Sequence, residues 1–177
     1  FISLDEFKTQ LQIIKNIIVE KHQSLYVDEV DLLLNKVNLF GFHFATLDIR
    51  QDSRVHQQII DDIISKKSDL NIETISDQEK LDWLLKTDII LDPNDFDGIT
   101  KDTLQNVYNI KSMQQKNGER GMHRYIISNS EAVKEVLNVF ALFRLCGYSE
   151  DEINIDIVPL FETMEGLANC EEVMRQL

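Results

Sequence analysis

Two charged side chains lie where apolar segments end, and both are of types that could do chemistry. Arg50 belongs to the stretch 46–53 (TLDIRQDS), at the end of an apolar run, and Glu162 follows the apolar segment 153–161 (INIDIVPLF). An arginine presents a planar fork of donors that suits phosphate or carboxylate. A glutamate emerging from a hydrophobic strand can accept a proton or bind a hard divalent cation. The alternative is structural: Arg50 pairs with a neighbouring aspartate, and Glu162 caps the next helix.

Three segments have the composition of buried strands, and each is followed by a helical pattern. Runs rich in aromatic and β-branched residues predict strands at 42–49, 122–128 and 153–161. Apolar spacing predicts the helices that follow them, at 53–67, 130–146 and from about 164 to 177. Strands that alternate with helices are typical of a parallel α/β arrangement. Further helices are expected at 3–21, 27–40, around Trp83 and from 104 to 117. Capping boxes are predicted at the first and third of these, from Ser3 with Glu6 and from Ser76 with Glu79.

The balance of helix and strand favours part of a barrel over an open sheet. Three strands are few for an independent open sheet, and long helical stretches separate them. We predict a predominantly helical α/β fold: a partial (β/α) TIM-like barrel with helical insertions and three parallel strands. We expect residues 1–177 to form a single domain, with a helical lead-in at 1–41 and strand–helix units at 42–177. Because the chain begins Phe-Ile-Ser-Leu, without Met or a signal segment, we expect it to be an internal piece of a larger protein.

Composition argues against several classes of protein. The chain has 31 acidic and 18 basic residues, a net charge of −13, which disfavours binding to nucleic acid or anionic lipid. No apolar run approaches the roughly 20 residues that cross a bilayer, so we expect no membrane span. Cys146 and Cys170 lack the spacing of a disulfide framework or zinc site. Two such thiols are typical of a reducing, cytoplasmic location.

Sites in barrels and parallel sheets form at the C-terminal ends of strands, which brings other residues into consideration. His56, one helical turn after Arg50, could reach such a site, although a surface or helix-stabilising role is favoured. Ser128 and Asn129 end the second predicted strand, and capping of the next helix would account for them. Three methionines are expected to pack in the core: Met113, Met164 and Met174.

Several of these segments together resemble a known enzyme family. The pieces FGFHFATLDIRQDS with the following His56, then YIIS, then VPLFETMEGLANCEEVMRQL, occur in this order. They are similar to phosphoenolpyruvate carboxylase of the bacterial and plant type, whose signatures include LDIRQ-[acid]-S and PLFET. The resemblance is weaker over residues 71–120. It implies a barrel with far more helix than a simple one.

The resemblance also implies site residues and a reaction. Arg50 would be a catalytic residue that contacts the phosphate or carboxylate of phosphoenolpyruvate, and Glu162 would be a ligand of the essential Mg²⁺ or Mn²⁺. Asp48 and Asp52 are expected to hold Arg50 in place. Bicarbonate attacks the phosphorus, giving carboxyphosphate and the enolate of pyruvate. Carboxyphosphate then releases CO₂ and leaves phosphate, and the enolate attacks CO₂ to form oxaloacetate. This carbon dioxide fixation supplies the tricarboxylic acid cycle and uses no biotin or nucleotide.

The resemblance further implies that the whole enzyme, a carboxy-lyase, is a homotetramer. The family's catalytic histidine, second metal carboxylate and glycine- and arginine-rich loops have no counterpart here, so the 177 residues alone are expected to be inactive. One alternative is a non-enzymatic acidic helical interaction module. Another is a different magnesium-dependent barrel enzyme acting on phosphoenolpyruvate or pyruvate. If the carboxylase hypothesis is right, the strand ends open on one side, and Arg50 and Glu162 point into one cavity.

Overall fold

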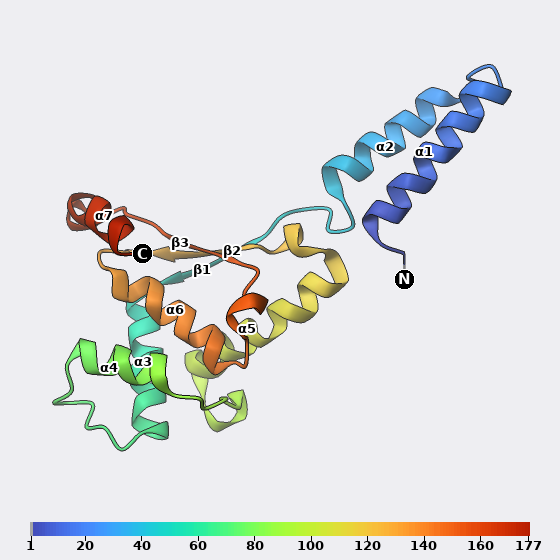
Figure 1. Cartoon of the computed structure of the whole chain (residues 1–177). Coiled ribbons are helices and arrows are strands. Elements are labelled where there is room, and N and C mark those ends of the chain that lie inside the picture. The colour runs from blue at the N-terminus through green and yellow to red at the C-terminus, as the bar shows by residue number, and fades with distance from the viewer. Residues whose placement is uncertain (1) are drawn as a thin grey trace.

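The computed structural model describes residues 2–177, which form a projecting helical hairpin and a larger α/β unit (Figure 1). The hairpin consists of α1 (Leu4–Lys21) and α2 (Val27–Phe40). The α/β unit contains β1 (Asp48–Asp52), α3 (Ser53–Lys67), α4 (Asp77–Lys86), α5 (Gly98–Asn117), β2 (Arg124–Ser128), α6 (Val133–Leu145), β3 (Asp156–Pro159) and α7 (Met164–Gln176). Short 3-10 turns lie at Pro93–Asp95, Glu119–Gly121 and Glu150–Glu152.

The three strands form one parallel sheet in the order β1-β2-β3. The predominantly helical α/β class and the three parallel strands are therefore confirmed. Because all three run in the same direction, their C-terminal ends meet at one edge of the sheet. The sheet does not close on itself within residues 2–177, so the barrel stays a prediction.

The first strand does not lie where the sequence pattern placed it. The expected strand at 42–49 is wrong, because β1 spans only Asp48–Asp52. Phe44 has a left-handed backbone conformation (φ 62°), and its ring stacks on Phe40 at a centroid distance of 5.3 Å. The aromatic residues that suggested a strand thus pack against the end of the hairpin. Arg50 consequently lies at the centre of β1 rather than beyond its end. The other two strands are also shorter than expected, at 124–128 and 156–159.

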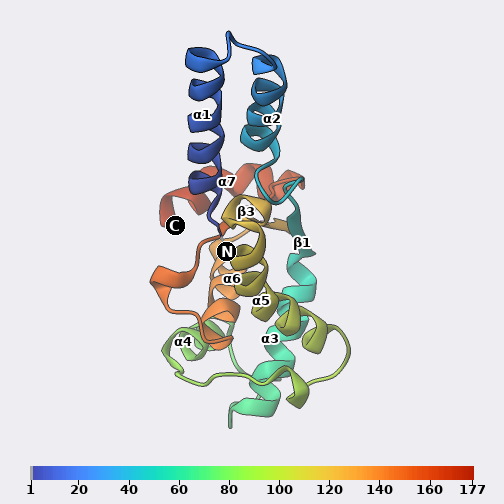
Figure 2. The same ribbon diagram turned by 90° about the vertical axis from the view of Figure 1, so that its right-hand side faces the viewer.

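The hydrophobic core lies between one face of the sheet and helices α3, α5 and α6, as Figures 1 and 2 show from two directions. Tyr125 and Ile127 of β2 are buried against these helices, whereas Ile126 between them is less buried. This alternation is that of a strand with one covered face. The expectation that the methionines pack in the core is wrong, since Met164 is 85%, Met174 58% and Met113 39% exposed.

The hairpin is stabilised by a helix cap and an ion pair more than by burial of apolar side chains. Ser3 and Glu6 form the predicted capping box at the start of α1. A salt bridge of 2.6 Å joins Lys15 to Asp31 across the two helices. Leu11 is the buried hydrophobic residue of α1, while several neighbours stay exposed. Figure 2 shows the hairpin extending away from the sheet, so we expect it to add little to the stability of the α/β unit.

Because the core lies in the α/β unit and the hairpin is largely exposed, replacing Ile by Ala should affect stability differently in the two parts. Replacing Ile63, which is fully buried in α3, by Ala should lower the free energy of unfolding by about 2–5 kcal/mol. Replacing Ile13, 46% exposed in α1, by Ala should lower it by about 1 kcal/mol or less. The measurement is urea denaturation followed by the fluorescence of Trp83, the single tryptophan, which packs against the core. Equal losses in the two variants would contradict the division.

Candidate functional site

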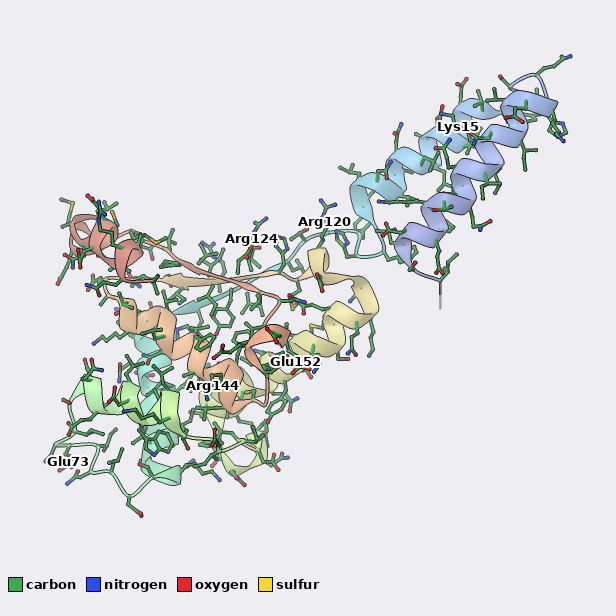
Figure 3. The ribbon with its side chains drawn as sticks, in the orientation of Figure 1. Lys15, Glu73, Arg120, Arg124, Arg144 and Glu152 are labelled. Atoms are coloured by element: carbon green, nitrogen blue, oxygen red, sulfur yellow. The ribbon has the colours of Figure 1, made fainter. Side chains whose placement is uncertain are left out.

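The face of the sheet opposite the helices is bare. In β1, Ile49 packs against the core, while Asp48 and Arg50 on the alternate positions are exposed. Figure 3 shows Arg124 of β2 on the side of the sheet away from α3 and α6. The strand register places Arg50 opposite Ile126, and Ile126 opposite Val158. We call this surface the open face; Arg50, Ile126 and Val158 form its middle row.

The aspartates on either side of Arg50 are engaged elsewhere. Asp48 pairs with Arg124 at 3.6 Å, and Asp52 pairs with Arg54 at 2.6 Å. Across residues 2–177, no salt bridge or side-chain hydrogen bond involves Arg50. The expectation that Asp48 and Asp52 hold Arg50 is therefore wrong. The structural alternative for Arg50 fails for the same reason, and its exposed guanidinium lies in a row of the sheet whose other side chains are apolar.

Asp52 has a structural position at the start of α3. Its Oδ1 accepts hydrogen bonds from the backbone N–H and Nε of Arg54, both at 2.9 Å, which makes it the N-cap of α3. Its Oδ2 accepts from Arg54 Nη2 at 2.6 Å and from Asn129 Nδ2 at 2.7 Å. These bonds, those from the Arg54 side chain above all, hold the pKa of Asp52 far below its ordinary value. Asp52 is thus an anion that joins the ends of β1 and β2.

Glu162 lies just beyond β3, and its carboxylate reaches the end of β2. Glu162 Oε1 accepts a hydrogen bond from the backbone N–H of Asn129 at 3.0 Å. The alternative that Glu162 caps α7 is wrong, because Thr163 is the N-cap and its Oγ1 accepts from Gly166 N at 2.9 Å. The carboxylate is exposed at the edge of the sheet where the three strands end.

Arg50 and Glu162 lie toward the same edge but do not share the cavity found there. Arg50 is two residues before the end of β1, and Glu162 follows the end of β3. A cavity of about 330 Å³ beside the strand ends is lined by other side chains: Ser53, Arg54, Gln57, Asn129, Glu131, Lys134, Glu135, Asn138 and Thr163. Arg50 and Glu162 therefore lie toward the same edge of the sheet, as expected. The prediction that they point into one cavity is not met within residues 2–177.

The role of Asn129 could not be recognised from sequence patterns. The expectation that Ser128 and Asn129 cap the next helix is wrong, because α6 begins at Val133 and Ala132 N donates to Glu135 Oε2 at 2.6 Å. Asn129 instead has a left-handed backbone conformation, φ 54°. Asparagine enters this region more readily than most residues. The position of Asn129 directly after a predicted strand is the one feature of the sequence that could have indicated this role.

His56 is neither a surface residue nor close to the open face. It is fully buried between α3 and the sheet, and its Nε2 lies 2.9 Å from the hydroxyl of Tyr125. Its Nδ1 is the buried side-chain nitrogen that has no hydrogen-bond partner in the described part of the chain. Burial lowers the pKa of His56 from 6.5 to about 4, against a smaller opposite effect of Asp52. The histidine is therefore a neutral core residue at physiological pH.

This buried histidine predicts a loss of stability in mild acid. Below pH 6.5 the unfolded chain takes up a proton at His56 that the folded chain accepts only near pH 4, so stability falls through this range. From pH 7.5 to 5, the wild-type chain should lose about 2 kcal/mol more than His56→Gln, which can still reach Tyr125 but does not titrate. Urea denaturation of both chains at each pH measures the difference. Parallel pH dependences would contradict the assignment.

The side chains at this edge of the sheet provide one ligand for a divalent cation, but not a complete metal site. Among residues 2–177, no group of three or more His, Cys, Asp or Glu side chains could hold a metal. Mg²⁺, however, commonly takes one or two carboxylates and completes its shell with water and substrate oxygen. Glu162 supplies such a carboxylate, exposed and oriented by a backbone N–H.

Comparison with known proteins identifies the family. The family model described as phosphoenolpyruvate carboxylase matches residues 1–177. The chain belongs to the phosphoenolpyruvate carboxylase family. Relatives with that name include those of Prochlorococcus marinus (strain MIT 9312), 36% identical, and Synechococcus sp. (strain WH7803), 31% identical. Each alignment covers 99% of this chain and 18% of the relative.

The chain thus spans about a fifth of the length of the relatives that it matches. None of the helices formed by residues 2–177 has the length and apolar character needed to cross a bilayer.

Proposed function

We propose that this chain is part of an enzyme that carboxylates phosphoenolpyruvate with bicarbonate to give oxaloacetate and phosphate. The observation that carries the proposal is Arg50, an exposed guanidinium on the open face with neighbouring aspartates already paired. A multiply negative substrate must lose water to bind, and a fixed cation compensates that loss. Membership of the family supports the same activity.

In the whole enzyme, the open face would line the interior of a barrel. The covered face already has its helices, as the outer ring of a (β/α) barrel requires. The open face carries layers across the strands: Asp48, Arg124 and Asp156 in one, and Arg50, Ile126 and Val158 in the next. Strands outside this chain would complete the barrel and enclose Arg50. The strand ends would then open on the catalytic side.

Each of the two residues has a proposed task. Arg50 would bind the phosphoryl oxygens of phosphoenolpyruvate and neutralise charge there during transfer to bicarbonate. Glu162 would hold Mg²⁺ or Mn²⁺, which when bound supplies Lewis-acid stabilisation of an enolate oxygen. The Asn129 N–H would keep the Glu162 carboxylate at the strand ends. With one metal ligand and one phosphate contact, the 177 residues alone would be inactive.

Some expectations from the sequence remain predictions: the cytoplasmic location, the homotetramer, and the lack of biotin and nucleotide. Family membership weighs against the interaction-module alternative, since the relatives are named as an enzyme. It weighs equally against a different magnesium-dependent barrel enzyme acting on phosphoenolpyruvate or pyruvate.

The test is a coupled assay of oxaloacetate formation by the full-length enzyme. Arg50→Ala should lower kcat/KM for phosphoenolpyruvate by about 10²- to 10³-fold, because a preorganised donor to the transition state is lost. Glu162→Gln should raise the Mg²⁺ concentration needed for half-maximal activity by about 10-fold or more.

Matched controls come from α7. Arg175 and Glu171 pair with each other on its exposed surface, so Arg175→Ala and Glu171→Gln should leave activity unchanged. Wild-type kinetics in Arg50→Ala would refute the substrate contact. An inactive full-length enzyme would refute the reaction itself.

A further inference from the structure

One short loop joins all three strand ends, and Asn129 is at its centre. The loop that follows β2 makes hydrogen bonds to the segment before α7 from three successive residues. Asn129 N donates to Glu162 Oε1 at 3.0 Å, Ser130 N to Leu160 O at 3.2 Å, and Glu131 Oε1 accepts from Thr163 Oγ1 at 2.7 Å. The segment that carries Glu162 is thus fixed along its length.

Close packing holds the same junction. A Cβ added at Gly166, in the first turn of α7, would lie 2.5 Å from the backbone oxygen of Ser130. Only a residue without a side chain therefore allows α7 to begin so near the loop. The backbone of the segment that carries Glu162 is consequently held close to the loop that contains Asn129.

Asn129 also makes contact with the end of β1, through both its side chain and its carbonyl. Its Nδ2 donates to Asp52 Oδ2 at 2.7 Å, and its carbonyl oxygen accepts from Ser53 Oγ at 2.8 Å. Its backbone is left-handed, with φ 54°, and its N–H donates to Glu162. The Asp52 carboxylate, already fixed by Arg54, thereby serves as the anchor for this conformation.

We propose that Asn129 is a positioning residue for Glu162: its side-chain amide, anchored on Asp52, holds the backbone N–H that orients the metal-ligating carboxylate. The inference rests on the proposed role of Glu162 and goes beyond it, since Asn129 touches neither substrate nor metal. A carboxylate that is oriented in advance loses less freedom when it binds a cation. Groups that orient metal ligands typically contribute 10- to 100-fold to metal affinity.

The experiment is a titration of the full-length enzyme with Mn²⁺ in the absence of substrate, in which electron paramagnetic resonance measures the unbound ion. Asn129→Gly removes the anchoring amide but adopts a positive φ without strain. It should weaken Mn²⁺ binding by about 10-fold. Asn129→Ala should weaken it at least as much, and this variant decides the matter if the Gly variant does not fold.

Two further variants make the outcomes distinct. Asn106→Ala makes the same chemical change as Asn129→Ala at an exposed position of α5 and should bind Mn²⁺ as the wild type does. Glu162→Gln tests the ligand itself. Weaker binding in Glu162→Gln with wild-type binding in Asn129→Gly would overturn the positioning role and leave the proposed function intact. Wild-type binding in Glu162→Gln would overturn both the positioning role of Asn129 and the proposed role of Glu162 as a metal ligand, while the proposed reaction is tested separately by the activity of the full-length enzyme.

Discussion

The structure depends on a three-stranded parallel sheet that has helices on only one face. Parallel strands need long crossovers, and here α3, α5 and α6 supply both the crossovers and the core. With one face covered, alternate residues must point to the other, where this chain provides nothing to bury them. The exposed charge of the open face and the gathering of strand ends at one edge both follow from this arrangement.

Among the charged residues of β1, the two aspartates take part in ion pairs, whereas Arg50 takes part in none within residues 2–177. Asp48 is paired across the sheet, and Asp52 is fixed as the helix cap of α3. Both arrangements use arginines other than Arg50, although Arg50 is nearer in sequence than Arg124. The result is a cation without a partner in this part of the chain, in the row of the open face that otherwise carries apolar side chains. Such a group is suited to an anionic ligand and contributes little to folding.

Family membership and geometry are complementary here. The relatives match nearly the whole chain, yet the chain spans less than a fifth of their length. A strand edge and a bare sheet face are expected of a unit whose neighbours lie in other parts of a polypeptide. The apolar side chains exposed on the hairpin and on α7 are consistent with the same relationship. The polar junction around Asn129, by contrast, is complete within the chain.

Local sequence determined most elements, while the tertiary structure decided which residues meet. The bounds of α2 and α3, the capping boxes of α1 and α4 and the strand–helix order could be predicted, because spacing and caps act within a few residues. The strand at 42–49 could not, because its aromatic side chains found partners in the hairpin. The burial of His56 against Tyr125 could not be predicted either, because the two residues are 69 positions apart in the sequence. The link from Asp52 through Asn129 to Glu162 joins segments that only the parallel register brings together.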